Sequence, residues 1–262
     1  MDNIVYNGID SRSIGLRINR ITPFATPARR ITQYVVPGRN GMVAVDDGTF
    51  ENVTLEYGIA KYGSRSGDMA AANAIKAWLC QDGQYHRLED SRWPDHYMMA
   101  AAMPPDITQI GSARRSVEAV IRFDCLPERW LKSGETPIIL DMAGYGAPSV
   151  TVLNPTGYIA HPLIDIPETQ QPISIRVRQS SWFGYAEYLI AAHDGTVRID
   201  SFSGNAIYLD GQLGGSSANS VVSAYLNGPD DFELRAGEST IMAIIDQPEA
   251  VEIKLYPRWW EV

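Results

Sequence analysis

The most informative segment of the chain is RRITQYVVPGRNG, which occupies residues 29–41. Its first half is rich in β-branched and aromatic residues, which favour extended backbone. Pro37-Gly38 or Asn40-Gly41 then supplies residues of the kind that reverse a chain. The segment therefore predicts a β-hairpin whose second strand includes residues 42–45.

The hairpin lies in a basic part of an acidic chain. Residues 12–41 contain six arginines and no acidic residue, whereas the 262-residue protein has a formal net charge of −9. A basic arm on an acidic body can bind a neighbouring subunit of opposite charge and add strands to its sheet. We therefore expect an interaction arm at about residues 12–45. A nucleic-acid-binding arm, which the overall charge disfavours, and a solvated hairpin without a partner are the alternatives.

Outward from the arm, the chain shows the period of two that is typical of strands. Apolar and polar residues alternate over residues 53–59 and 117–123, which predicts two half-buried strands. Asp47-Gly48 precedes the first of these segments. Because this dipeptide between two β-like segments favours a tight turn, it predicts a further hairpin there.

One segment has helical spacing instead. Apolar residues recur at helical intervals between Ala71 and Leu79. Asp68 can cap the first turn, and Gly83 suits the left-handed residue that ends a helix. The pattern predicts a single amphipathic helix over residues 69–81 that covers a small sheet.

The second half of the chain has a different pattern. Residues 125–149 contain six prolines and glycines with little periodicity, which indicates a connector between domains at residues 1–135 and 136–262. Beyond the connector, short strands and turns alternate at the spacing typical of a β-sandwich or jelly roll. The predicted strands are Ser149–Val152, Leu163–Ile166, Ile173–Arg178, Glu187–Ile190, Thr196–Asp200, Ala206–Leu209, Val221–Tyr225, Ser239–Ile245 and Ala250–Leu255.

The sequence lacks the motifs of the common enzyme and cofactor classes. No lysine follows a glycine, which excludes a phosphate-binding P-loop, and the four histidines show no metal-ligand spacing. No catalytic residue, cofactor site or metal site is predicted, so we expect a protein that is not an enzyme. No run of about 18 apolar residues occurs, and membrane insertion is therefore not expected.

Aromatic residues in the second domain leave a second function open. Trp182, Phe183 and Tyr185, with Tyr188 close by, have the flat faces that stack on sugar rings. Because of these residues, the alternative function is that of a carbohydrate-binding module that recognises a host surface. A place in the core or at a partner interface is the favoured interpretation of the same residues.

Several segments, taken in order, resemble the distal tail proteins of long-tailed bacteriophages, a family of baseplate hub ring proteins. The chain opens with YNGIDS at residues 6–11 and Gly15-Leu16-Arg17. The arm and the strand after it contribute VPGRNG and DDGTFENV, and the second domain contributes NPT, LRAGESTI and YPRWW. The order and spacing of these segments extend the resemblance over nearly the whole chain.

The resemblance implies a mainly β fold with two domains. The first would be a split-barrel-like β domain with one helix and a long hairpin arm, and the second a galectin-like β-sandwich. Six copies would form a ring that leaves a channel for DNA passage, with no stable nucleic-acid binding. The arm would clasp the next subunit. From the residues of the arm itself, we expect Arg29, Arg30 and Arg39 to make the contacts, with Tyr34 and Val36 as apolar anchors.

The resemblance also implies a location and a set of partners. The ring would lie at the tail tip of the virion, after assembly in the host cytoplasm. It would join the tail tube protein to the tail-associated hub or fibre protein and would contact the tape-measure protein.

Overall fold

The computed structural model describes residues 2–22, 24–62, 67–111, 116–142, 147–179, 184–209, 225–227, 232–246, 249 and 251–262. The chain is mainly β with one α-helix among these residues, which confirms the predicted fold class. It divides into two compact units, Met1–Arg129 with Val262 (unit 1) and Trp130–Glu261 (unit 2). This division lies within the segment of prolines and glycines, a few residues before the predicted boundary.

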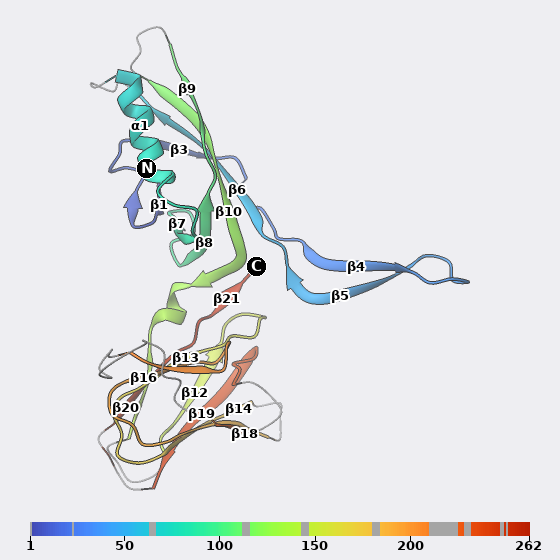
Figure 1. The fold of residues 1–262 in the computed structure, drawn as a ribbon, viewed down its shortest axis with the longest axis vertical. Helices are drawn as coiled ribbons and strands as arrows, with labels where there is room; N and C mark the ends of the chain where they lie inside the picture. The colour runs from blue at the N-terminus through green and yellow to red at the C-terminus, as the bar shows by residue number, and fades with distance from the viewer. Residues whose placement is uncertain are drawn as a thin grey trace. The chain divides into compact units, whose positions relative to one another are not determined.

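Unit 1 is built on one large sheet, which Figure 1 shows with its helix and its arm. Eight strands of this sheet come from the first half of the chain: β1 (Ile4–Tyr6), β2 (Ile9–Asp10), β3 (Arg17–Arg20), β6 (Val53–Lys61), β7 (His86–Asp90), β8 (His96–Ala102), β9 (Asp106–Gln109) and β10 (Val117–Leu131). Their order is β2-β1-β7-β8-β10-β6-β3, and β9 pairs with the first part of β10. The two predicted alternating strands are β6 and β10, which pair antiparallel from Val53 opposite Cys125 to Lys61 opposite Val117.

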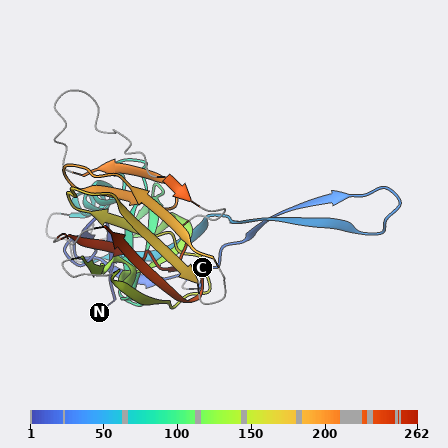
Figure 2. The ribbon, with the colours of Figure 1, turned by 90° about the horizontal axis from the view of Figure 1, so that it is seen from below.

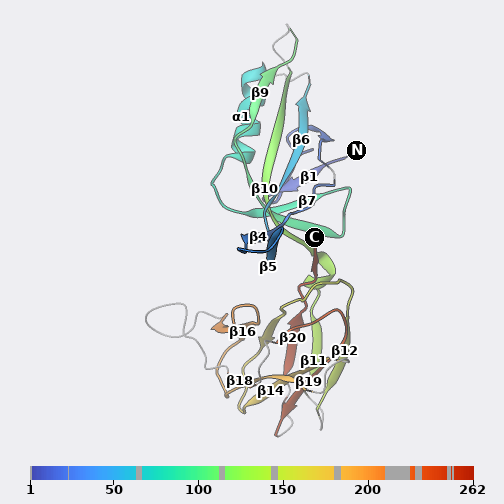
Figure 3. The same ribbon diagram turned by 90° about the vertical axis from the view of Figure 1, so that its right-hand side faces the viewer.

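The helix α1 (Gly67–Leu79) packs on one face of this sheet, as Figure 3 shows. Its buried residues share one core with the inward residues of β6 and β10. The outward residues of β6 and β10 are more exposed and mostly polar or small, so these strands have one apolar face and one solvated face. The alternation in the sequence therefore reports which face the helix covers.

The end of the helix differs from the prediction. The helix ends at Leu79, where the Cys80 amide still donates to the Lys76 carbonyl at 2.8 Å. Gly83 lies beyond this end, and its φ is not in the left-handed region, so its predicted role as the helix terminator is wrong. The Asp68 carboxylate accepts from the Met69 amide at 2.8 Å, in the first turn where the prediction put a capping residue.

Unit 2 begins with the short 3₁₀ helix η1 (Lys132–Glu135) and contains two five-stranded sheets. One sheet has the order β11 (Ile138–Asp141), β20 (Glu252–Tyr256), β13 (Leu163–Ile166), β16 (Val197–Asp200) and β17 (Asn205–Tyr208). The other has the order β12 (Ser149–Asn154), β19 (Gly237–Ile245), β14 (Ile173–Gln179), β15 (Ala186–Ile190) and β18 (Tyr225–Asn227). The chain closes with β21 (Trp260–Glu261).

The two sheets of unit 2 share a single buried core, as expected of a sandwich. Eight of the nine predicted strands in this half match observed strands to within about two residues at each end. The ninth, Val221–Tyr225, lies outside the described residues except for Tyr225, where β18 begins. The sequence missed β11, which lies in the segment predicted to be a connector.

The hairpin arm consists of β4 (Arg29–Val35) and β5 (Met42–Phe50), which form a separate two-stranded sheet. Two expectations about this region are wrong. Residues 12–28 do not belong to the arm, since β3 pairs with β6 in the large sheet. Asp47-Gly48 does not turn the chain either, because β5 runs through both residues.

Candidate functional site: a hairpin arm

The arm, defined as residues 29–50, extends away from the other strands of unit 1, as Figures 1 and 2 show. Among the described residues, β4 pairs only with β5, from Val35 opposite Met42 to Arg29 opposite Phe50. Every residue of β4 is exposed. An isolated two-stranded hairpin is at best marginally stable in water, so the arm is a candidate for a segment that is completed by a partner.

Two glycines of the loop between β4 and β5 shape the tip of the arm. Gly38 has φ 79° and Gly41 has φ 81°, a region that costs other residues free energy. The Arg39 amide donates to the Val36 carbonyl at 3.2 Å, which closes the loop. Both turn signals in the sequence therefore contribute to the same reversal.

A bulge near the base of the arm involves the Asp-Gly dipeptide. Ile31 lies opposite Asp46, but Arg29 lies opposite Phe50, so β5 has two more residues than β4 over this interval. Gly48 has φ 83°, and its amide donates to the Asp46 carboxylate at 2.9 Å. A glycine with positive φ is typical of such bulges, which bend and twist a ladder.

Below the bulge, the two ends of the arm meet. The Glu51 amide donates to the Ala28 carbonyl at 2.8 Å, just before β4 and just after β5. The arm is therefore an insertion whose two ends are adjacent in the body of unit 1.

The charges of the arm are concentrated at its base. The Arg29 guanidinium lies 3.2 Å from the Asp46 carboxylate and 4.6 Å from the centroid of the Phe50 ring. The hydroxyl of Thr49 donates to the Asp47 carboxylate at 2.7 Å, and this bond lowers the pKa of Asp47. The positive charge of nearby Arg30 lowers the same pKa by a smaller amount. Two of the three arginines in the arm thus face acidic groups of the arm itself.

The remaining arginines of the basic segment belong to the body of unit 1. Arg12 pairs with Asp10 at 2.6 Å, and the guanidinium of Arg17 lies 5.4 Å from the Tyr62 ring centroid. Arg20 is buried against Asp90. The basic character of residues 12–41 therefore does not belong to the arm as a whole, and Arg39 is the single charged residue between residues 31 and 45.

Exposed apolar side chains dominate the outer arm, which we define as residues 31–45. A two-stranded ribbon cannot bury such residues by itself, and exposed apolar patches mark interaction surfaces. The exposed fractions are 51% for Ile31, 55% for Tyr34, 73% for Val35, 41% for Val36, 59% for Met42 and 48% for Val45.

The five residues predicted for the interface all lie on the arm or its tip. Tyr34 and Val36 are exposed, and Arg39 lies in the terminal loop. The sequence prediction missed Ile31, Val35, Met42 and Val45, although their apolar character on a segment predicted to project was a usable signal. Whether these residues contact a partner stays a prediction.

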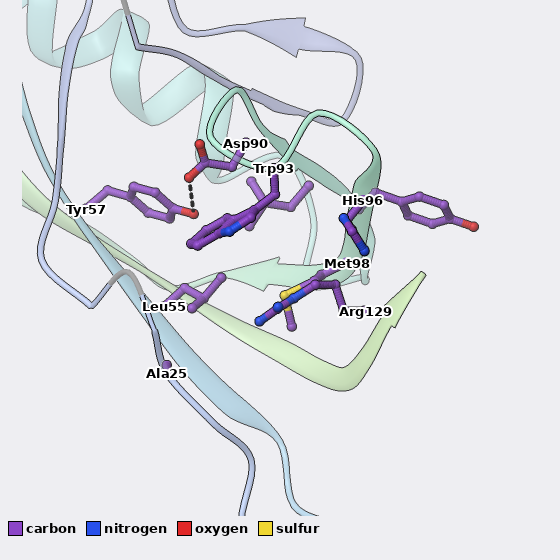
Figure 4. Close-up of a pocket in the computed structure, with 10 residues that line it drawn as sticks. Ala25, Leu55, Tyr57, Asp90, Trp93, His96, Met98 and Arg129 are labelled. Atoms are coloured by element: carbon purple, nitrogen blue, oxygen red, sulfur yellow. Dashed lines mark hydrogen bonds between the residues drawn. The ribbon is translucent and has the colours of Figure 1, made fainter. Parts of the chain in front are cut away.

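Unit 1 also contains a small pocket, shown in Figure 4, which residues of β6, β7, β8 and β10 line together with Ala25 and Trp93. Its volume of about 30 Å³ is enough for at least one water molecule. The lining residues are Ala25, Leu55, Tyr57, Leu88, Asp90, Trp93, His96, Tyr97, Met98 and Arg129.

The polar groups of this pocket are bound to one another. The Tyr57 hydroxyl donates to the Asp90 carboxylate at 3.2 Å, and Arg20 donates to the same carboxylate at 2.7 Å. Burial, and next the negative charge of Asp90, raise the pKa of Tyr57 above its ordinary value. We interpret this cluster as structural, since a neutral phenol and a paired carboxylate stabilise the fold here.

The predicted carbohydrate platform is only partly described. Trp182 and Phe183 lie outside the described residues. Tyr185 is 44% exposed, and the Arg176 guanidinium lies 4.7 Å from its ring centroid. Tyr188 is buried and stacks on Phe232 at 5.0 Å, so its inclusion in the platform is wrong, while sugar binding at Tyr185 stays a prediction.

The described part of the chain offers neither a metal site nor a membrane-spanning helix. No group of three or more histidine, cysteine or acidic residues is arranged there to hold a metal ion. Within the same residues, the one α-helix is too short and too polar to cross a membrane.

The fold of this chain is similar to those of solved phage hub and baseplate proteins. The solved structure of SPP1 Dit (gp 19.1), described as a paradigm of the hub adsorption apparatus in phages that infect Gram-positive hosts, matches with a TM-score of 0.69 and 12% identity, over 100% of both chains. Two structures of the phage P2 baseplate in its activated conformation, with Ca and with Sr, match with TM-scores of 0.51 and identities of 10% and 11%. These two matches cover 97% of this chain, and 97% and 96% of the other chains. No family model and no curated protein matches the sequence.

Proposed function

We propose that this protein is a structural subunit of a phage tail tip, and that it assembles with sister copies into a closed ring through its arm. The observation that carries the proposal is the arm, a projecting hairpin with exposed apolar side chains and no pairing partner among the described strands. The fold shared with SPP1 Dit over the full length supports the location in a baseplate.

In the proposed assembly, each arm binds the body of the next subunit. Such a head-to-tail interface produces a filament unless the rotation between copies closes, and a rotation of about 60° closes a ring of six. The ring joins the tail tube protein to the tail-associated hub or fibre protein, contacts the tape-measure protein and leaves a channel through which DNA passes. The role is mechanical and requires no catalytic residue.

The adjacency of Ala28 and Glu51 provides a direct test. Replacing residues 29–50 by Asn-Gly removes the arm and joins its ends with a tight turn, because those ends are already hydrogen-bonded at 2.8 Å. We expect the full-length protein to have the mass of six copies by mass photometry and the variant to have the mass of one. Circular dichroism and thermal unfolding check that the shortened chain is folded.

Two results would contradict the proposal. One is a folded variant that still has the mass of six copies, because the arm would then be dispensable for the ring. The other is a full-length protein that remains a monomer at every accessible concentration.

A further inference from the structure

We propose that the arm is buried on both of its faces, and that sister copies of this chain cover both. This inference rests on the proposed ring and adds to it, since a clasp that lies on a surface would bury a single face. It follows from the register of the hairpin and from where the arm carries its charges.

The register assigns every side chain of the outer arm to a face. Residues directly opposite in an antiparallel pair point to the same side, and neighbours along a strand point to opposite sides. Val35 pairs with Met42 and Ile31 with Asp46, so the first face carries Ile31, Val35 and Met42, with Gln33 and Ala44 between them. Tyr34 pairs with Val43 and Thr32 with Val45, so the second face carries Tyr34, Val43 and Val45.

The two faces therefore have the same chemistry. Each has three large apolar side chains, and Asp46 is the single charged residue on either, at the end near the bulge. The exposed fractions of Val35 and Met42 on the first face, 73% and 59%, are matched by 55% and 48% for Tyr34 and Val45 on the second. Neither face resembles a surface that stays in water.

The strand β6, next in sequence, is a reference within the same chain. It has one buried apolar face, with Val53 and Leu55, and a second face with Thr54 and Glu56 that is exposed or half-buried. A strand covered on one side shows this alternation, whereas strands buried on both sides read as continuous apolar runs. In the outer arm, residues 42–45 are a continuous apolar run of this second class, and β4 has apolar residues on both faces although Thr32 and Gln33 interrupt it. Among the described residues, the outer arm has no second layer on either side.

The charges favour sister copies as the occupants. Arg29 is paired within the arm at its base, which leaves Arg39 at the tip as the charge of the outer arm. The protein's formal net charge of −9 makes the surface of a second copy attractive to that arginine. The apolar character of both faces is typical of permanent interfaces between identical chains, while transient interfaces with other proteins are more polar.

The test measures whether each face is accessible to a thiol reagent in the assembled protein. Cys80 is exposed and Cys125 is buried, and burial raises the pKa of Cys125 to about 12, so a Cys80→Ser background has little native reactivity. In that background, Val35→Cys reports on the first face and Val45→Cys on the second. Met69→Cys on α1 is the control, because Met69 is 70% exposed and lies outside the arm.

We expect maleimide to label both arm positions at least tenfold more slowly than the control in the purified ring. If one arm position is protected and the other labels like the control, the arm is covered on one face, which overturns this inference but leaves the ring intact. If both positions label like the control in an intact ring, both the inference and the clasping role of the arm fail.

A second measurement does not depend on labelling. Val35→Asp and Val45→Asp each introduce a charge on one face, with Met69→Asp as the matched exposed control. We expect either arm variant to shift the mass distribution from six copies to one, with at least a tenfold loss of assembled protein, and the control to assemble normally. Normal assembly of either arm variant would overturn the inference for that face.

Discussion

At the scale of single residues, Asp90 links three segments of unit 1. Its carboxylate accepts from the Arg20 guanidinium at 2.7 Å, from the Tyr57 hydroxyl at 3.2 Å and from the Arg92 amide at 2.8 Å. The side chains of Arg20 and Asp90 are each 7% exposed. Removing one partner of a buried ion pair leaves the other charge buried without compensation, which is costly.

We therefore expect Asp90→Asn to lower the free energy of unfolding by about 3 kcal/mol, the range found for broken buried pairs. Urea denaturation measures the change. Glu56→Gln is the control, because Glu56 pairs with Arg122, which is 48% exposed, and such pairs contribute about 1 kcal/mol or less. Equal effects of the two substitutions would contradict a structural role for Asp90.

Gly134 in η1 is required for a different reason. A Cβ atom at this position would lie 2.4 Å from the Trp259 amide nitrogen and 3.1 Å from the Arg258 Cα, both of which are backbone atoms. We expect Gly134→Ala to lower the free energy of unfolding by about 2 kcal/mol, as overpacking does. Gly83→Ala should have little effect, since nothing lies within 4 Å of that Cβ position. Thermal unfolding of both variants tests the difference, and an unaffected Gly134→Ala would refute it.

At the scale of elements, the sequence predicts strands better than it predicts what lies between them. Eight of nine predicted strands in the second half are observed, because short alternating segments bounded by turn residues are local signals. Asp47-Gly48 was misassigned for a physical reason. A glycine with positive φ serves both a hairpin turn and a bulge, and the partner strand β4 decides between them.

The arm was predictable as a hairpin but not in its extent or its charge. The arginines of residues 12–41 look like one basic segment in the sequence, yet Arg20 is buried against Asp90 and Arg29 pairs across the arm. These partners come from other strands and cannot be read from local composition. The apolar residues of the outer arm were visible in the sequence, but their exposure depends on the absence of a second layer.

The bulge yields a prediction for the arm as an element. Val at residue 48 would have to adopt φ near 83°, which is strained for a β-branched residue. We expect Gly48→Val to weaken ring assembly, measured by mass photometry, while the melting temperature of the body stays unchanged because the bulge lies in the exposed arm. Thr54→Val, at an exposed position of β6, is the control. A variant that assembles like the wild type would show that the bend of the arm is unimportant.

At the scale of the whole molecule, two forces could hold the proposed ring together. One is attraction between a basic arm and an acidic body, and the other is strand addition with apolar burial, which we expect from the sequence to dominate because exposed arginine pairs contribute little. In the structure, Arg39 is the one charge between residues 31 and 45, while large apolar side chains are exposed on both faces. Apolar burial should therefore supply most of the affinity, and charge should guide the approach.

Salt separates the two forces. Raising the sodium chloride concentration from about 0.05 M to about 0.5 M shortens the screening length severalfold and weakens exposed charge pairs. Hydrophobic association is not weakened in this way, so we expect the assembled fraction in analytical ultracentrifugation to stay constant or to rise. Dissociation of the ring across this range would show that charge is the main source of affinity.

The hydrogen bond between Ala28 and Glu51 has a consequence for how such a molecule can change. Because the arm begins and ends at one point, a residue added to each strand lengthens its reach by about 3.3 Å and leaves the rest of the subunit untouched. The length of the hairpin can therefore change independently of the fold of unit 1. If the proposed ring forms, changes to this insertion alone would alter the spacing between neighbouring copies and the width of the central channel.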